Sequence, residues 1–394
     1  MPPLPLPVEI LDYIFNFLAD EPKTLADLAL VSRSFVQSSR ALYPESINIT
    51  PENLETLLLL LKSPHRTISR NIRKIDIQGP WDDHSSNILL TTNWQLPLDS
   101  FGNTVLSLSL FAIDFDSLSS MAYQTFLAGF PRVQFLKLHS MKFISVSQVM
   151  NTLGQFPALR AASLCNIAWN NPDNDTPETI FPYRIPSGLY KLTLKECYKR
   201  DIMRCFLSQE SLPLIKELDL GAVSPSDTEA IGEYLGRLGP VLSSLSFGFD
   251  SLDPGGDAED FYHNCNLALN TSLKSLHYDP FVDFFVSSLT NPWPWISRTI
   301  STLHSNALTQ ICFSIHLITS RPLIDCVQFT WSEMDRFFAN KLPTTTLPRC
   351  TSLQLWIHFD DVLSPDLVQM IREFMTEQFP LCHENGLLTI RFVT

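Results

Sequence analysis

Basic residues are scarce in this sequence, in which 28 Lys and Arg stand against 41 Asp and Glu and give a net charge of −13 at pH 7. Nucleic acids and anionic membranes attract proteins that present a cationic surface. The charge balance therefore argues against a nucleic-acid partner and against binding to an anionic membrane. The longest stretch without a charged residue, 299–320, carries several polar side chains, so no membrane-spanning segment is expected.

Targeting and redox patterns are also missing. The apolar start of the chain has no basic region before it and is interrupted by Glu9 and Asp12, which is not the pattern of a secretory signal. The eight cysteines include no CxxC pair, so we expect reduced and mostly buried thiols. These absences indicate an intracellular chain, in the cytosol or the nucleus.

The sequence contains no GxSxG, GxxxxGK[ST], HExxH or GxGxxG motif, and these motifs position the reactive groups of common enzyme classes. We therefore expect no catalytic residue, no metal site and no cofactor. The adjacent Cys382 and His383 are interpreted as a resting loop pair, and residues 293–295 (WPW) as a packing wedge. The acidic groups at 257–260 and 360–361 could ligate a metal, but solvated loop charge is the preferred interpretation. A hydrolase with an unrecognised site stays an alternative.

Apolar residues dominate the first predicted helix, residues 8–18. At 100° per residue, its polar side chains fall in a stripe about 60° wide and its apolar side chains fill about 220°. A helix lying on its own core needs an apolar arc of only about 100°, so this helix requires burial on two sides. Thr24, with Asp27 three residues later, is expected to cap a second helix, and a third is expected at 35–42.

The segment LPVEILDYIFNFL, followed by TLADLALVSRSF and ALYPESI, resembles the F-box, the adaptor-binding motif of Skp–cullin–F-box ubiquitin ligases. The resemblance covers residue 6 to about residue 43, with Phe35 where the family often has tryptophan. It implies a three-helix F-box domain at 1–45 that binds a Skp adaptor and, through it, a cullin. The residues implied for the adaptor contact are Leu6, Pro7, Ile10, Ile14, Leu28, Leu30 and Val31. The other interpretation is that these helices only cap the next domain.

A second pattern recurs through residues 46–394. It is a phrase with aliphatic residues at its first, fourth and sixth positions. The phrase begins at Ile72, Val105, Val133, Leu159, Leu189, Ile215, Leu242, Leu273, Leu308, Cys350 and Leu387. The starts are roughly 26–42 residues apart, and the phrase is that of leucine-rich repeats, in which one strand of each repeat has alternate residues buried. With a short leading strand at 46–50, about 11–12 strands are expected.

The segments between the phrases are typical of helices, for example those opened by Ser224-Pro225 and by Ser364-Pro365, the latter running to about Gln378. The fold class is therefore predicted as α/β, with an F-box followed by a curved solenoid built on a parallel sheet. A doubly wound sheet is less suitable because its strands are continuous apolar runs, whereas here polar residues are interleaved. The Asn or Cys ladder of regular repeats is mostly absent. The whole resembles the irregular leucine-rich F-box proteins abundant in fungi.

Positions three, five and seven of each phrase point away from the core and define the candidate target-binding surface. Between residues 135 and 219 these positions combine an aromatic group with both signs of charge. The candidate residues are Phe135, Lys137, His139, Lys191, Lys195, Glu217 and Asp219. Such a surface is suited to a mixed-charge protein segment, and ordinary solvated strand faces are the alternative.

These features predict a substrate-recognition subunit of a Skp–cullin–F-box ubiquitin ligase. Its F-box would hold the adaptor and its solenoid would hold a target protein. Such a protein acts by proximity and is not itself an enzyme. The alternative is an F-box scaffold that acts outside a ubiquitin ligase.

Overall fold

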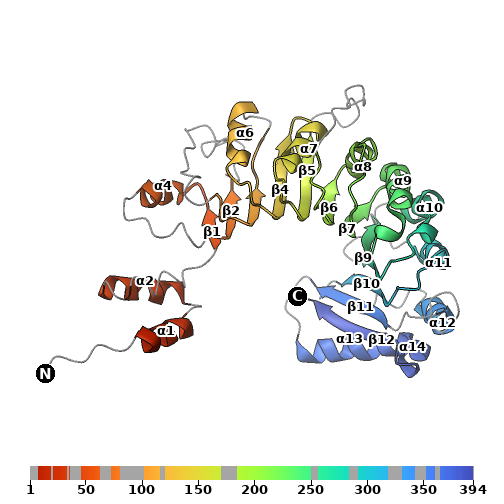
Figure 1. The fold of residues 1–394 in the computed structure, drawn as a ribbon. Coiled ribbons are helices and arrows are strands. Elements are labelled where there is room, and N and C mark those ends of the chain that lie inside the picture. Colours follow the sequence, from red (N-terminus) through yellow and green to blue (C-terminus); the bar gives the residue numbers. More distant parts are fainter. Residues whose placement is uncertain are drawn as a thin grey trace. The chain divides into compact units, whose positions relative to one another are not determined.

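The computed structural model describes residues 8–18, 21–32, 35, 46–62, 72–79, 102–115, 120–169, 184–249, 256–283, 292–317, 331–341, 352–359 and 364–393. Strands and helices alternate along these residues (Figure 1). The strands are β1 (Ser46–Ile49), β2 (Lys74–Gln78), β3 (Ser107–Phe111), β4 (Phe135–Phe143), β5 (Ala161–Trp169), β6 (Lys191–Cys197), β7 (Glu217–Val223), β8 (Ser244–Phe249), β9 (Ser275–Asp283), β10 (Gln310–Leu317), β11 (Ser352–Phe359) and β12 (Leu388–Val393). The α-helices are α1 (Val8–Phe17), α2 (Pro22–Val31), α4 (Leu54–Lys62), α6 (Ser120–Ala128), α7 (Val146–Gly154), α8 (Lys199–Leu207), α9 (Thr228–Leu238), α10 (Gly256–Asn264), α11 (Trp293–Ser301), α12 (Trp331–Lys341), α13 (Pro365–Gln378) and α14 (Pro380–Glu384).

The strands form a 12-stranded parallel sheet in which each strand lies beside the next one along the chain. Strands β2 to β11 each begin at the third residue of the repeated phrase. Equivalent phrase positions pair across neighbouring strands, as Lys74 does with Ser107 and Ser107 with Phe135. The strand order never reverses, which excludes the doubly wound alternative, because that fold has a reversal point. The predicted α/β class with 11–12 parallel strands is confirmed.

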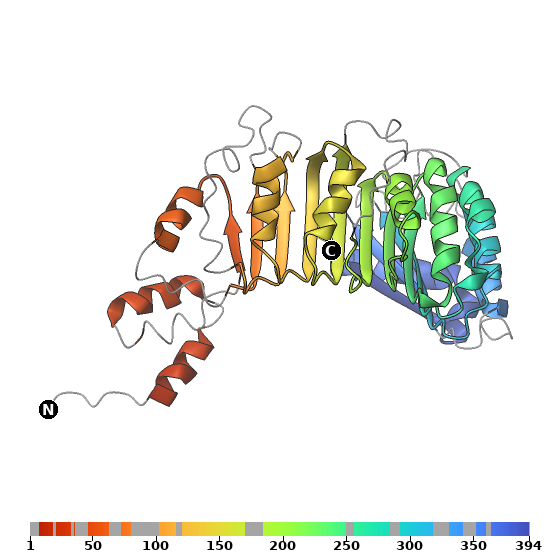
Figure 2. The same ribbon diagram turned by 45° about the horizontal axis from the view of Figure 1, so that its top comes forward.

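The chain divides into two compact units, the first made of residues 1–162 and 168–170 and the second of residues 163–167 and 171–394. The division runs through β5, and the expected boundary at residue 45 falls within the first unit. Residues 36–45, which include most of the expected third helix, lie outside the described residues. In the second unit, α8, α9, α10 and α11 follow one another along one face of the strands (Figures 1 and 2).

Aromatic side chains fill much of the core of the second unit. Phe313 of β10 is fully buried and stacks on Tyr278 of β9, with ring centroids 5.1 Å apart. The rings of Phe281, Trp293 and Phe338 also contact Phe313. Trp293 opens α11 and is buried, which confirms the packing role expected at 293–295 for Trp293, whereas Pro294 is exposed and Trp295 is partly exposed.

Helix starts follow the sequence signals in two places and depart from them in one. Ser364 caps α13, accepting a hydrogen bond from the Leu367 amide, and the helix ends at Gln378 as predicted. Residues 225–227 form a 3-10 turn that leads into α9. The predicted cap at Thr24 is wrong, because α2 begins two residues earlier at Pro22 and Thr24 instead bonds the Glu21 carboxylate. Proline at the first helical position loses no intrahelical hydrogen bond and has the φ angle of a helix.

Apolar side chains replace the polar ladder of regular repeats, as the sequence indicates. Ile113, Met141 and Val223 stand where the ladder residue is expected, and all three are buried. The residues before the first two, Ala112 and Ser140, have φ angles of 52° and 54°, in the left-handed region that non-glycine residues adopt rarely. The repeats therefore close their turns by a recurrent backbone bend rather than by a buried amide ladder.

Six of the eight cysteines lie in the described part of the chain, and all six are free thiols. Three of them are buried and three are partly exposed. Among the described helices none combines the length and the apolar character needed to cross a membrane.

Candidate functional site

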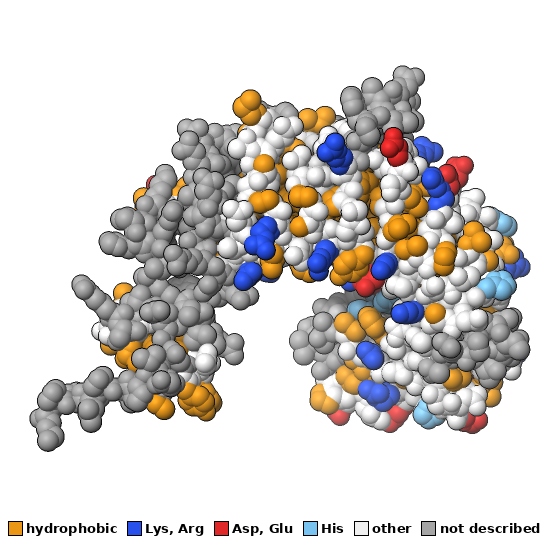
Figure 3. Space-filling view, viewed as in Figure 1, with side chains coloured by type: hydrophobic (Ala, Val, Ile, Leu, Met, Phe, Trp, Pro, Cys, Tyr) orange, Lys and Arg blue, Asp and Glu red, His pale blue; other side chains and the backbone are white. Residues whose placement is uncertain are grey.

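The helices α1 and α2 have a small buried interior and a large exposed apolar surface. Phe15 and Leu25 are buried, and the ring of Phe15 packs edge-on against that of Phe35 at 5.6 Å. By contrast, Leu30 and Val31 at the end of α2 are 86% and 71% exposed. Figure 3 shows hydrophobic side chains on the surface of this part of the chain.

The residues implied for the adaptor contact are mostly on this surface. Ile10 and Ile14 of α1 are exposed, as are Leu30 and Val31, and Leu28 is half-buried. Leu6 and Pro7 lie outside the described residues. Tyr13 and Phe17, which the sequence analysis did not include, extend the exposed surface along α1. We call the described exposed set, Ile10, Tyr13, Ile14, Phe17, Leu30 and Val31, the helical apolar surface.

The predicted target-binding residues are distributed between the two units. Phe135, Lys137 and His139 lie on β4 in the first unit, where Phe135 is exposed. The Lys137 ammonium lies over the Phe111 ring at 5.3 Å, and the His139 ring lies 5.8 Å from the same ring. The three side chains project from one strand, and Lys137 and His139 share Phe111 as a neighbour.

The remaining four predicted residues form ion pairs on β6 and β7 in the second unit. Lys191 and Glu217 are register partners with a 3.1 Å contact between Nζ and Oε2, and both side chains are well exposed. Lys195 Nζ lies 3.5 Å from Asp219 Oδ2 and 3.4 Å from Asp279 Oδ2. The basic strand face therefore lies directly against the acidic one.

Lys195 reaches from β6 to Asp279 of β9 because the strands between them carry no bulk there. A Cβ on Gly221 of β7 would meet the Lys195 side chain at 3.0 Å, and one on Gly248 of β8 would meet the Asp279 backbone at 2.5 Å. Burial alone would lower the pKa of Lys195, but the two carboxylates outweigh it and raise the pKa above its ordinary value. Lys195 is thus held charged within a network rather than left available at the surface.

A polar network continues across β9, β10 and β11. Ser314 Oγ lies 2.8 Å from His277 Nε2 and 3.3 Å from His358 Nε2. Trp356 Nε1 donates to Gln354 Oε1 at 3.0 Å, and the Trp356 ring packs edge-on against the His277 ring at 4.7 Å. Hydrogen bonds of this kind fix the orientation of the side chains that they join.

Burial sets the charge of this network. It lowers the pKa of His277 below its ordinary value despite the nearby Asp279 carboxylate. Burial and the neighbouring His316 likewise lower the pKa of His358. Burial opposes ionisation of Asp279, but its contacts with His316 and Lys195 outweigh burial and hold the pKa of the carboxyl well below its usual range. At neutral pH the ionised Asp279 carboxylate therefore lies near the neutral imidazoles of His277 and His358.

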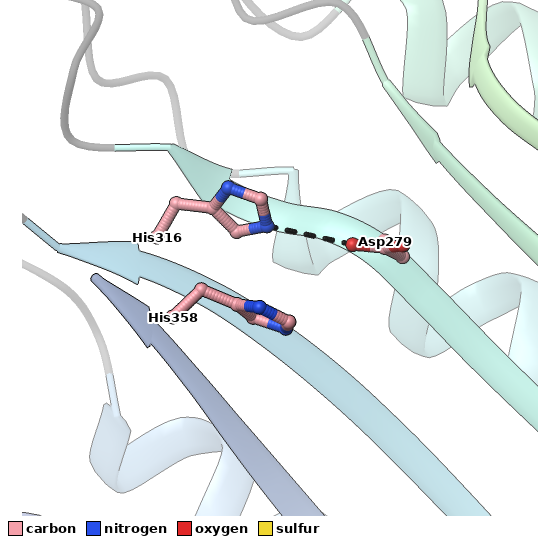
Figure 4. A group of neighbouring side chains, drawn as sticks. All are labelled: Asp279, His316 and His358. Atoms are coloured by element: carbon pink, nitrogen blue, oxygen red, sulfur yellow. Dashed lines mark ion pairs between the residues drawn. The ribbon is translucent and has the colours of Figure 1, made fainter. Parts of the chain in front are cut away.

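Asp279, His316 and His358 converge on one point of the network (Figure 4). One potential ligand atom from each lies within 4.8 Å of the other two. His316 and His358 are register partners on β10 and β11. Asp279 comes from β9 at the place where the β9–β10 register shifts, and such irregularities redirect side chains.

His277 and Asp279 occupy positions five and seven of the phrase that begins at Leu273, so the repeat pattern places both on the outward strand face. The pattern does not by itself connect them with His316 and His358. A signal for the pair was present in the repeats. Both histidines occupy the ninth position of their phrase and follow an isoleucine, in SIHL and in WIHF. Equal phrase positions on neighbouring strands lie side by side, so two successive repeats with histidine there bring the rings together.

Cys382 and His383 lie in helix α14 rather than in a loop. The Cys382 side chain is buried, and burial together with Asp335 raises the pKa of its thiol. A thiol with a raised pKa is a poor nucleophile, which agrees with the expected resting role. Of the acidic groups considered as metal ligands, residues 360–361 lie outside the described residues, and residues 257–260 are part of α10.

No protein-family model matches this chain, and no curated protein matches it.

Proposed function

We propose that this chain is a substrate-recognition subunit of a Skp–cullin–F-box ubiquitin ligase. The helical apolar surface would bind a Skp adaptor, and the outward face of the repeat strands would bind a target protein. The observation that carries the proposal is the exposure of Ile10, Ile14, Leu30 and Val31. These are four of the seven residues that the F-box resemblance assigns to the adaptor contact.

Energetics support a partner for this surface. Burying one large aliphatic or aromatic side chain is worth about 1.5–3 kcal/mol, and six such side chains here are in contact with solvent. Exposed apolar groups gathered on neighbouring elements, unlike scattered ones, are typical of protein interfaces. The sequential parallel sheet supports the second half of the proposal, because it presents a row of outward side chains that a target could contact.

Charged residues in the helical apolar surface are expected to abolish adaptor binding. For the double variant Leu30→Asp, Val31→Asp we expect at least about a tenfold loss of co-purified adaptor. Two apolar side chains that would be buried against the adaptor are replaced by charges that would have to be desolvated there. The measurement is quantitative pull-down of a co-expressed Skp adaptor and cullin. The control variant Met121→Asp, Ile144→Asp changes exposed apolar residues outside α1 and α2 and should retain wild-type recovery.

Wild-type recovery of the adaptor by the Leu30→Asp, Val31→Asp variant would show that α2 is not the contact surface. Recovery of the adaptor without a cullin would favour the alternative, an F-box scaffold that acts outside a ligase. Joint recovery of adaptor and cullin supports the receptor.

The Lys191–Glu217 pair allows the target-binding half to be tested with little effect on folding. In the double variant Lys191→Glu, Glu217→Lys the ion pair is kept and its direction is reversed. An exposed pair contributes only about 0–1 kcal/mol to stability, but its orientation sets the register of a charged partner. We expect the recovery of at least one target to fall about fivefold or more, which corresponds to about 1 kcal/mol.

The readout is quantitative mass spectrometry of proteins labelled in proximity to the chain, with the proteasome inhibited. The control is the corresponding exchange of Lys74 and Asp76, a 2.9 Å pair on β2. If the set of recovered proteins is the same for the wild type and both exchanges, the β6–β7 face is not the target-binding surface.

A further inference from the structure

A group of three potential metal ligands lies on the outward face of β9, β10 and β11. They are the Asp279 carboxylate and one ring nitrogen each of His316 and His358 (Figure 4). Within the described residues this is the one group of three or more such side chains whose ligand atoms approach so closely. The group comes from three successive strands, so the sheet itself holds the ligands in place.

The contact between Asp279 and His316 has the spacing of two metal ligands. His316 Nε2 lies 3.5 Å from Asp279 Oδ1, and His316 Nε2 is buried without a hydrogen-bond partner. A hydrogen bond would bring these atoms to about 2.7–3.2 Å. Two ligands of a tetrahedral Zn²⁺ with bonds of about 2.0–2.2 Å are separated by roughly 3.3–3.5 Å. A metal ion between them would satisfy the buried nitrogen.

The surroundings of the three side chains have the features of an outer ligand shell. Asp279 presents Oδ1 to His316 and uses Oδ2 to contact Lys195. Ser314 Oγ lies 3.3 Å from His358 Nε2. Metal-bound carboxylates and imidazoles are commonly oriented by such outer partners.

The local charge favours a cation. The basic side chain Lys195 contacts the group through Asp279. Its ammonium also contacts a second carboxylate, that of Asp219. Two carboxylates against one ammonium leave an excess of negative charge beside the imidazoles. A divalent cation placed there would have a favourable electrostatic environment even with Lys195 charged.

We propose that Asp279, His316 and His358 bind a Zn²⁺ ion. Two imidazoles and one carboxylate are a ligand set that selects zinc and similar transition-metal ions over Mg²⁺ and Ca²⁺, which prefer oxygen ligands. Three protein ligands leave one position of a tetrahedral site open, and this position faces outward, where water or a side chain of a bound protein completes the coordination. The proposal does not depend on the adaptor-binding function.

The test is Zn²⁺ binding to the full chain after metal removal with a chelator. Competition with a chromogenic zinc indicator is expected to give one strong site with a Kd of about 1 μM or lower. The variants Asp279→Asn and His358→Gln are expected to weaken binding at least about 100-fold, since loss of an outer partner alone costs about 10- to 100-fold. Mg²⁺ at the same concentration should not compete.

Exposed histidines elsewhere in the second unit provide the matched control. His304→Gln and His383→Gln should bind Zn²⁺ as tightly as the wild type. Substitution of Co²⁺ for Zn²⁺ should give the visible absorption of a tetrahedral site in the wild type and in the controls but not in the ligand variants. This spectrum distinguishes lost ligands from a misfolded variant, whose thermal midpoint is measured in the same preparations.

Absence of a strong Zn²⁺ site in the wild type would overturn the proposal. Wild-type affinity in both Asp279→Asn and His358→Gln would equally overturn it, because the bound ion would then be elsewhere. Neither outcome bears on adaptor recovery, which is measured separately.

Discussion

Phe313→Ala is expected to lower the free energy of unfolding of the second unit by about 3–5 kcal/mol. Phe313 is fully buried on β10, and its ring contacts four other aromatic rings from β9, α11 and α12. Removing the ring loses its transfer free energy and leaves a cavity, because the large neighbouring rings cannot collapse into the space. The measurement is urea-induced unfolding followed by tryptophan fluorescence.

Two comparison variants define what the Phe313 result means. Phe313→Leu keeps most of the volume and is expected to cost about 1.5 kcal/mol or less. Leu269→Ala removes an exposed apolar side chain and is expected to change stability by about 0.5 kcal/mol or less. Equal effects of Phe313→Ala and Leu269→Ala would show that the aromatic cluster does not organise this core.

Asp335→Ala is expected to lower the free energy of unfolding by about 2–4 kcal/mol, although the substitution removes a buried carboxylate. Asp335 lies on α12, is buried, and accepts hydrogen bonds from the backbone amides of Leu381 and Cys382 at 3.0 and 2.8 Å. These two amides belong to the first turn of α14, where the helix itself supplies no acceptor. Loss of the carboxylate leaves two amides without partners, and each costs about 1–3 kcal/mol where it is buried.

Comparison with an exposed cap isolates the effect of burial at Asp335. Ser364→Ala removes one side-chain cap from α13, at an exposed position, and is expected to cost about 1 kcal/mol. Asp335→Asn keeps one acceptor oxygen and should give an intermediate loss. The same urea titration measures all three, and a loss at Asp335→Ala no larger than at Ser364→Ala would contradict the role assigned to the carboxylate.

The order of the elements could be predicted because each repeat carries its own signal. The aliphatic phrase marks the strands, and β2 to β11 begin at its third position. Ser364-Pro365 marks the start of α13 because its signals, a capping hydroxyl and a proline, act within one turn. The Thr24 cap failed for the same local reason, since Pro22 offered a competing start two residues earlier.

The groupings of side chains across strands could not be predicted in the same way. The repeat pattern predicts Lys195 as part of an open target-binding surface, whereas Lys195 pairs with Asp219 and with Asp279, a residue 84 positions away. That contact depends on Gly221 and Gly248 leaving space on the strands between them. The glycines are visible in the sequence, but the sequence alone does not show which side chains occupy the space beside them.

The sequence by itself determined the α/β class, the parallel strands with polar outward positions, and the apolar residues of the first helices. These features follow from periodicity, which acts over neighbouring residues and needs no knowledge of distant ones. Only the tertiary structure decided which repeats face each other and where the register shifts. It therefore decided that Asp279, His316 and His358 meet, because the distance between side chains on different strands is set by register and strand spacing rather than by separation along the chain.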